Sequence, residues 1–333
     1  MIKKVFKIIK DFIKEEYKFL ISLIIIATIL VFPLPYYVIV GGGVTDITKR
    51  VKVENEYQSI GSFNFTFVKE LNGTTVSYLY GKLLNKEIIK SNSVKLDNES
   101  TKDYQLREKI AMMESYDNAI YSAYKLAGKE IDEISSNIKI LYILKEADTT
   151  LKVGDEILKI NDTTISNTEE YQEEFSKYKV GDSLNILVKR DGKEILCYAK
   201  VIDYAGRSVV GLYTYVDRKY ETAPKVSFNM KKKESGPSGG LMLALTIYNK
   251  LVEEDITKGY KIAGTGTIDI NGNIGEIGGI KYKLEGAVKK KVDIFIAPSG
   301  KNYQEVVELV QKNNYNIKVI EAKTLSQVVN DLS

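Results

Sequence analysis

A long run without a charged side chain, residues 19–40, constrains this chain more than any other feature of its sequence. A helix needs roughly 20 predominantly apolar residues to cross a bilayer. Six lysines precede the run, whereas only three basic residues follow it before Glu54. Because positive charge stays on the cytoplasmic side, we expect a cytoplasmic N-terminus over 1–18. A transmembrane helix over 19–40 then anchors the chain in the lipid bilayer, and the remainder lies outside the cell membrane.

Two other interpretations of this run stay open. Pro33 can end a shorter hydrophobic core, and Gly41, Gly42 and Gly43 supply small residues, as in a cleaved signal peptide. No A-x-A pattern follows the run, which favours an uncleaved anchor. A buried helix of a globular domain is the third interpretation, and the lack of any polar interruption argues against it.

The composition excludes several kinds of chemistry. The 333 residues suggest about two domains with room for an extra segment. The sequence contains no histidine, so a Ser-His-Asp system, a Cys-His system and a His-ligated metal are excluded. Cys197 is the single cysteine, which excludes an intrachain disulfide and a cysteine zinc cluster. A net charge of +4 is too small to indicate a nucleic-acid partner. We expect no cofactor and no metal, and a general base of Lys, Asp, Glu or Tyr.

The middle of the chain predicts β structure around one long helix. Residues 51–80 have strand-like alternation, most clearly at Phe63, Phe65 and Phe67, and residues 41–105 are expected to form a β-rich region. Residues 105–126 place apolar side chains at helical intervals among charges of both signs. This amphipathic helix is expected to pack on the next domain, with a membrane surface as the alternative. We group it with the hairpin-rich stretch that follows, in a domain over 106–206.

That stretch carries a recognisable motif. The run L-K-V-G-D-E-I-L-K-I-N-D-T-T-I over 151–165 is followed by V-G-D-S-L-N-I-L-V-K-R-D-G-K. With these motifs, the stretch resembles the PDZ domains attached to bacterial membrane proteases. The resemblance implies binding of extended peptide tails by strand addition. A small structural β domain that binds nothing is the alternative.

Ser238 lies where a glycine-rich turn enters an apolar helix, in the segment E-S-G-P-S-G-G-L-M-L-A-L. A helix start offers free backbone N–H groups and a positive dipole end, which stabilise a developing oxyanion. Gly239 and Gly240 let a substrate backbone come close. An N-cap serine is the simpler explanation of this segment alone. A phosphate loop is disfavoured, because no G-x-x-x-x-G-K-[ST] occurs in the sequence.

A second segment, residues 262–283, reads I-A-G-T-G-T-I-D-I-N-G-N-I-G-E-I-G-G-I-K-Y-K. By itself it predicts a β-hairpin followed by a helix. Together with G-P-S-G-G, it resembles the proteolytic domain of the Lon family, over roughly the last third of the chain. The G-P-S-x-G and G-G-x-K-x-K motifs occur in the family's order.

The resemblance implies the roles of individual residues. Ser238 matches the nucleophile, Lys283 the general base and Thr265 the threonine that hydrogen-bonds this lysine. Spacing alone does not choose between Lys281 and Lys283, and Thr265 has an ordinary strand threonine as its alternative. A lysine base must be desolvated until its pKa falls from about 10.4 toward 7 or 8. The remaining candidates for the oxyanion hole or substrate groove are Pro237, Gly239 and Gly240.

The whole arrangement is expected to be α+β and multidomain, with the α/β Lon-type proteolytic domain over 207–333. It resembles the membrane-anchored, PDZ-containing Lon-like peptidases of Gram-positive bacteria. This implies a serine endopeptidase that cleaves peptides or unfolded proteins outside the membrane, with a homo-oligomer as a further partner. The alternatives are a catalytically inactive, membrane-tethered PDZ scaffold and a signal-peptidase-like Ser-Lys protease. The latter places its serine soon after the anchor, where no Ser-x-x-Pro-like site occurs.

Overall fold

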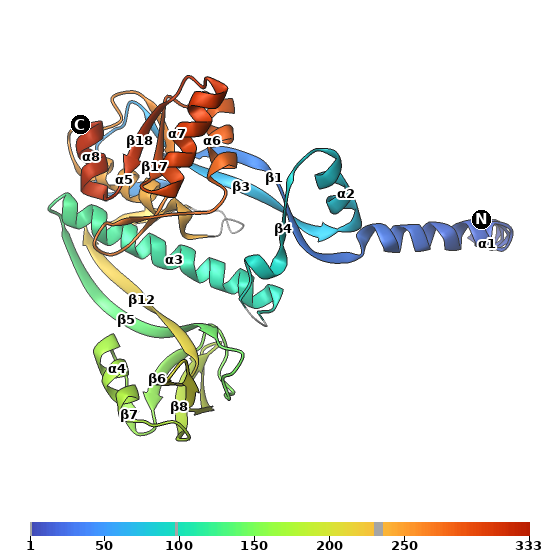
Figure 1. Cartoon of the computed structure of the whole chain (residues 1–333), viewed down its shortest axis with the longest axis horizontal. Helices are drawn as coiled ribbons and strands as arrows, with labels where there is room; N and C mark the ends of the chain where they lie inside the picture. The colour runs from blue at the N-terminus through green and yellow to red at the C-terminus, as the bar shows by residue number, and fades with distance from the viewer. Residues whose placement is uncertain (1, 97–98, 230–235) are drawn as a thin grey trace. The chain divides into compact units, whose positions relative to one another are not determined.

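The computed structural model describes residues 2–96, 99–229 and 236–333 and divides into two compact units (Figure 1). The first unit contains Met1–Val40 and Val68–Val94, and the second contains Gly41–Phe67 and Lys95–Ser333. Two long strands, β1 (Pro33–Asp46) and β3 (Ser62–Thr74), contribute residues to both units. The expected β-rich region over 41–105 is therefore divided between two units.

The first unit consists of helices around a short antiparallel pair of strands. Its elements are α1 (Ile2–Val31), the beginning of β1, the end of β3, α2 (Thr75–Leu83), β4 (Glu87–Lys90) and the 3₁₀ helix η1 (Ser91–Ser93). The beginning of β1 pairs with β4, with Tyr36 opposite Lys90. Thr74 caps α2 by accepting a hydrogen bond from the backbone N–H of Ser77, and the Ser77 hydroxyl accepts one from the Thr74 N–H.

The prediction of one transmembrane helix over 19–40 is wrong in its extent. Helix α1 ends at Val31, and residues 33–40 belong to strand β1. Pro33 explains the break, because proline lacks an N–H donor and disfavours helical backbone at Phe32. The residues after Pro33 are rich in aromatic and β-branched types, which suit a strand. Within the described residues, no helix combines the length and the apolar character that crossing a membrane requires.

A mainly parallel sheet organises the second unit. Four strands follow one another in the order β18-β17-β14-β3, with every neighbouring pair parallel, and β1 is next to β3. The strands not yet given bounds are β14 (Lys261–Gly264), β17 (Ile294–Pro298) and β18 (Lys318–Ala322). Ser62 is opposite Lys261, and Phe65 is opposite Gly264. Residues 62–67 thus complete a sheet whose other parallel strands come from the C-terminal part of the chain.

Helices cover both faces of this sheet. They are α3 (Thr101–Leu126), α5 (Gly240–Leu251), α6 (Ile280–Lys289), α7 (Lys301–Asn313) and α8 (Leu325–Leu332). Successive side chains of a strand point to opposite faces, and Ile262 and Ala263 accordingly belong to different cores. Ile262 joins the core of α3, α5 and α8, whereas Ala263 joins that of α6 and α7.

Helix α3, expected to belong with the PDZ-like domain, packs mainly elsewhere. Its buried residues Ala119, Ala123 and Tyr124 lie in the same core as Leu241 of α5. The packing expected for an amphipathic helix is therefore observed, but its main partner is the C-terminal α/β domain. Figure 1 shows α3 running beside that domain and leading directly into strand β5.

The PDZ-like region is a separate sheet in the order β12-β5-β6-β8-β9, with β7 beside β6. Its elements are β5 (Glu130–Ile143), β6 (Glu156–Ile160), β7 (Thr163–Thr164), α4 (Thr168–Ser176), β8 (Ser183–Arg190), β9 (Lys193–Lys200) and β12 (Leu212–Ala223). Strand β12 pairs with β5 along its whole length, so this sheet extends past the expected boundary at residue 206. Three two-stranded pairs complete the fold: β10 (Ile202–Tyr204) with β11 (Arg207–Val209), β2 (Val51–Val53) with β13 (Val226–Phe228), and β15 (Thr267–Ile268) with β16 (Ile274–Gly275).

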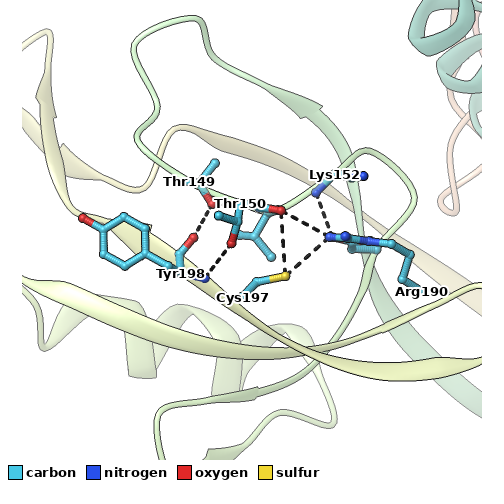
Figure 2. Close-up of polar contacts among 8 residues, drawn as sticks. Thr149, Thr150, Lys152, Arg190, Cys197 and Tyr198 are labelled. Carbon is cyan, nitrogen blue, oxygen red and sulfur yellow. Dashed lines mark hydrogen bonds and ion pairs between the residues drawn. The ribbon is translucent and has the colours of Figure 1, made fainter.

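A buried ion pair explains the two motifs of the PDZ-like region. Arg190 of the R-D-G hairpin donates from Nε and Nη2 to the two carboxylate oxygens of Asp155 at 2.6 Å each, and Asp155 comes from the V-G-D turn. The same guanidinium donates to the Thr150 carbonyl oxygen at 3.3 Å and lies 3.4 Å from the sulfur of Cys197 (Figure 2). Asp155 is 1% exposed. The motif residues therefore fix the loop before β6 against the β8–β9 hairpin.

Candidate active site

Ser238 lies in a short 3₁₀ helix, η2 (Pro237–Gly239), that continues into α5. Gly236 precedes it with φ +89°, a left-handed conformation that favours glycine. Pro237 follows at a helix start, where its missing N–H costs nothing. The sequence G-P-S thus turns the chain sharply and places the Ser238 hydroxyl at the N-terminal end of a buried helix.

Lys283 reaches this serine from helix α6. Its Nζ is 2.8 Å from Ser238 Oγ and 2.9 Å from Thr265 Oγ1, and Lys283 is 3% exposed. Lys281, which spacing alone leaves as an alternative, is exposed, with its Nζ 5.7 Å from the centre of the Tyr282 ring. The structure therefore brings Lys283, and not Lys281, to Ser238.

Burial changes the acid–base chemistry of Lys283. It lowers the pKa of the Lys283 ammonium from 10.5 to about 7, because the charged form loses its hydration. Within residues 2–96, 99–229 and 236–333, no carboxylate forms an ion pair with this Nζ that would restore the charge. About half of the Lys283 side chains are consequently neutral amines near pH 7, each with a lone pair for the Ser238 proton.

Thr265 connects the two residues. Its side-chain oxygen donates to the backbone carbonyl of Ser238 at 3.0 Å and accepts from Lys283 Nζ. Its backbone N–H donates to the Ile296 carbonyl of β17, which fixes the residue just after β14. Because one N–H of the Lys283 amine donates to Thr265, the orientation of Nζ is fixed, with the nitrogen next to Ser238 Oγ.

The three other expected site residues have different surroundings. Pro237 borders an open cavity. Gly239 is half-buried, and a Cβ on it would lie 3.0 Å from the Phe65 ring. Gly240 is buried, and a Cβ there would collide with Ser115 Oγ. Gly240 therefore packs closely against α3, which occupies the space expected there for a substrate backbone.

Helix α6 is held in place from two directions. Asn302 accepts a hydrogen bond from the Ile277 N–H at 2.8 Å and donates to the Ile277 carbonyl at 3.1 Å, which clamps the segment before the helix. On the other side, strand β1 passes so closely that a Cβ on Gly42 would collide with the Tyr282 carbonyl oxygen. The glycines at 41–43, expected to supply small residues after the apolar run, thus lie in β1, and Gly42 and Gly43 pack on the helix that carries Lys283.

Helix α3 contributes contacts that the sequence did not predict. Ser115 Oγ donates to the Pro237 carbonyl at 2.8 Å, and the Gly236 N–H donates to the Glu108 carbonyl at 3.2 Å. Asn118 Nδ2 donates to the Ile268 carbonyl at 3.1 Å. The partners in each pair are far apart in the chain, and no local pattern relates them. Small residues on one helix, Ser115 and Ser122 among them, are the signal in the sequence, since Ser122 Oγ likewise donates to the Asp269 carbonyl at 3.1 Å.

No metal site is apparent in the part of the chain that the structure describes, where no three Cys, Asp or Glu side chains gather as ligands. The site itself provides a serine hydroxyl and a buried amine within hydrogen-bonding distance of each other. This is the equipment of a serine nucleophile with a lysine base.

Two family models match the chain. Residues 230–332 match the Lon protease (S16) C-terminal proteolytic domain, and residues 137–201 match the PDZ domain. Both domains predicted from the motifs are thereby confirmed. The chain is a mixed α/β multidomain protein with a Lon-type proteolytic domain and a PDZ domain, and these matches support a serine peptidase.

Similar proteins match parts of the chain. It is 32% identical to a Lon protease of Mesomycoplasma hyopneumoniae over 95 residues, which are 28% of this chain and 11% of that protein. It is 23% identical to a Lon protease of Campylobacter jejuni over 288 residues, 76% of this chain and 34% of that protein. The chain thus spans about a third or less of these relatives. A solved PDZ domain of an SdrC-like protein from Listeria innocua is 23% identical and covers 24% of this chain and 93% of its own, with a TM-score of 0.22.

Proposed function

We propose that this chain is a serine endopeptidase that cleaves peptides or unfolded proteins with Ser238 as the nucleophile and Lys283 as the general base. The observation that supports this most strongly is the 2.8 Å contact between Ser238 Oγ and the Nζ of a buried lysine whose pKa is lowered to about 7. A lysine with an ordinary pKa would be protonated and would not accept the serine proton at neutral pH.

The acylation step begins with the neutral amine. Lys283 Nζ takes the hydroxyl proton while Ser238 Oγ forms a bond to the peptide carbonyl carbon, and the carbonyl oxygen becomes an oxyanion. In this proposal, backbone N–H groups of the turn that carries Ser238 would stabilise this developing charge. The C–N bond then breaks, and the leaving amine takes the proton from Lys283. Ser238 remains as an acyl ester.

Deacylation repeats the sequence with water. Lys283, neutral again, takes a proton from a water molecule whose oxygen bonds to the ester carbonyl carbon. The bond from that carbon to Ser238 Oγ breaks, and the Lys283 proton returns to the serine oxygen. Thr265 serves both steps by holding the amine in one orientation, since its hydroxyl is fixed on the Ser238 carbonyl.

The test is hydrolysis of a labelled unfolded protein and a mixed peptide library by the purified chain without ATP. We expect cleavage that Ser238→Ala and Lys283→Met abolish, each in folded protein. Lys281→Met is the matched control, since it removes a nearby exposed lysine of the same helix and should leave activity unchanged. Absence of cleavage by the parent chain, with peptide tails still bound, would contradict the proposal and favour the PDZ scaffold.

The PDZ domain is proposed to hold substrate tails by strand addition. The match over residues 137–201 supports this role. Tail peptides from confirmed substrates should bind the Ser238→Ala chain, and the same peptides should compete with cleavage of the full substrates by the parent chain. Binding that leaves cleavage rates unchanged would contradict a substrate-holding role.

Attachment to a lipid bilayer with the catalytic domain outside the cell is a further part of the proposal. The apolar side chains of α1 from Phe19 to Val31 are largely solvent-exposed, with Ile24 at 64% and Val31 at 67%. Such a patch is unusual without a partner, and lysines precede it. The chain should float with lipid vesicles, and Ile24→Lys with Ile25→Lys should reduce flotation. Equal flotation of both proteins would contradict attachment through α1.

A further inference from the structure

A cavity of about 350 Å³ lies beside the nucleophile, between helix α3 and the β15–β16 pair. Glu114, Ser115 and Asn118 of α3 form one wall, and Ile268 and Asp269 lie on the other. Pro237, which is joined by a peptide bond to Ser238, also lines it. A volume of this size accommodates a long side chain and falls in the lower range of ligand pockets.

The walls of this cavity are fixed to the nucleophile segment. Ser115 Oγ donates to the Pro237 carbonyl at 2.8 Å, and Asn118 Nδ2 donates to the Ile268 carbonyl at 3.1 Å. Both bonds start from α3, so the helix holds the turn before Ser238 and the strand opposite it in one arrangement. A peptide positioned for attack by Ser238 would place a side chain next to its scissile bond within reach of the cavity.

The lining is acidic and has no basic residue among the described positions. The Asp269 carboxylate already has hydrogen-bond partners: it accepts from the backbone N–H groups of Asn271 and Asn273 and from the Asn273 side chain. Glu114, in contrast, is half-buried and forms no hydrogen bond or ion pair with any residue of the described ranges.

Charges of both signs lie around Glu114, including Arg218, Asp117 and Lys139. Burial raises the pKa of Glu114, and Arg218 offsets this in part. The same arginine forms an ion pair with Glu133 at 3.3 Å. Burial, together with the neighbouring Asp217 and Glu114, raises the pKa of Asp117 to about 7. A cation entering the cavity would therefore relieve a carboxylate that is partly desolvated and lacks a direct partner among the described residues.

We propose that this cavity is the subsite for a Lys or Arg side chain of the substrate beside the scissile bond, with Glu114 as its carboxylate partner. This inference rests on the proposed peptidase function. Apolar atoms of Ile268 and Ala111 on the lining would contact the methylene stem, while the charged end reaches the carboxylate. Glu114 lies outside the proteolytic match at 230–332, so a helix that precedes the PDZ domain supplies the selectivity of the catalytic site.

The first experiment compares hydrolysis of capped peptides that differ at one residue flanking the scissile bond, with Arg, Lys, citrulline or Met at that position. Citrulline matches arginine in shape and lacks its charge. The parent chain should prefer Arg over citrulline by about tenfold or more in kcat/KM, as for a charge-assisted hydrogen bond. Glu114→Gln should reduce this preference at least fivefold and leave the citrulline peptide within about twofold. Glu305→Gln, an exposed glutamate of α7, is the matched control.

A second measurement does not depend on catalysis. Binding of the Arg and citrulline peptides to Ser238→Ala is measured with and without Glu114→Gln. If the Arg peptide binds in a Glu114-dependent way but the parent chain does not hydrolyse it, the result supports the subsite and contradicts the peptidase function. Hydrolysis without a preference for basic residues, or with a preference that Glu114→Gln leaves intact, would overturn the subsite and keep the peptidase function. Absence of both hydrolysis and Glu114-dependent binding would overturn both.

Discussion

The catalytic site and the PDZ-like region each shield a cationic side chain, the buried Lys283 and the half-buried Arg190, whose side chain is 20% exposed, with opposite results. Arg190 contacts both oxygens of Asp155, and this hydrogen bonding raises the pKa of the guanidinium further above its ordinary value. Lys283 contacts two hydroxyl groups and no described carboxylate, and burial lowers its pKa to about 7. Burial alone therefore does not decide whether a cation is structural or reactive. The presence of a compensating anion decides it.

A second buried lysine in the α/β domain supports this distinction. Lys250 of α5 is 5% exposed, similar to Lys283, but its Nζ is 2.8 Å from the Glu56 carboxylate. Burial by itself would raise the pKa of Glu56, but hydrogen bonds from Lys250 and the Val53 N–H lower it overall. The same domain thus contains one lysine whose charge is compensated and one whose charge is not, and only the latter faces a nucleophile.

Lys283→Met should have the largest effect. Loss of the general base should lower kcat/KM by about 10²–10⁴-fold. The folded protein should nevertheless become more stable, because protonating a lysine whose pKa falls from 10.5 to about 7 costs roughly 3–5 kcal/mol. The folded state binds fewer protons than the unfolded state between these values, so this cost is full below pH 7 and vanishes above pH 10.5. Thermal unfolding at pH 6 and pH 10 checks this. A melting temperature that falls at pH 6 would contradict an uncompensated charge.

Asp155→Asn should have effects opposite to those of Lys283→Met: the protein should lose stability and keep its peptidase activity. Removing the buried carboxylate that pairs with this half-buried guanidinium should destabilise the PDZ-like region by about 1–3 kcal/mol, because Arg190 would keep its charge. Hydrolysis of short peptides should remain, since Ser238 and Lys283 lie outside the sheet of the PDZ-like region. Asp191→Asn, an exposed neighbour in the same hairpin region, is the control and should change neither property. Unchanged hydrogen exchange in strands β6 and β8 would show that the ion pair contributes no stability.

Gly42→Ala should disturb the site from a distance. Its Cβ would collide with the Tyr282 carbonyl and approach the Phe67 carbonyl, so helix α6 must shift with Lys283. Overpacking of this kind costs about 1–3 kcal/mol, and we expect activity to fall by at least tenfold. Gly286→Ala tests the same contact from the helix side, because its Cβ would lie 2.8 Å from the Gly43 nitrogen. Full activity in both variants would show that β1 does not position α6.

The pH dependence of kcat/KM should follow the protonation of the Lys283 amine. Only neutral Lys283 accepts the serine proton, so kcat/KM should rise with pH through about 7 and then level off. Below that midpoint each pH step of one should reduce the rate about tenfold. A profile that rises only near pH 10 would mean that Lys283 behaves like a solvated lysine. The measurement needs a neutral peptide, so that the substrate does not titrate.

The sequence identified the two central residues of this site better than their surroundings. The family resemblance of the G-P-S-G-G and G-G-x-K-x-K motifs singles out Ser238 and Lys283, whose side chains the structure brings together, whereas the glycine-rich turn alone favours an N-cap serine. The position of α6, which carries Lys283, depends in part on close contact with β1, near the opposite end of the chain. The contact of Ser115 with the nucleophile turn, and the place of Glu114 beside it, likewise arise only when α3 packs on α5. The residue pattern within a single helix or strand does not predict that these elements pack together.

The apolar run at 19–40 shows a related limit. An apolar run is consistent with a helix or with a buried strand, and length alone favours one helix. On sequence alone Pro33 suggests the end of a signal-peptide core, whereas in the structure it marks the change from α1 to β1. Residues Tyr37, Val38 and Ile39 are buried in that strand. Their aromatic and β-branched character indicates a strand. The charge pattern around the run indicates a membrane helix instead, and a prediction from the sequence gives that pattern more weight.

Direct titration of Lys283 tests the central claim. The chain is labelled with ¹³C and ¹⁵N at lysine, and the side-chain signals are followed by NMR from pH 5 to pH 11, with Lys283→Met identifying the resonance. We expect a midpoint near pH 7 for Lys283. A midpoint near 10.5, the ordinary value of a lysine, would contradict a lysine general base, because Ser238 would then have no base at neutral pH.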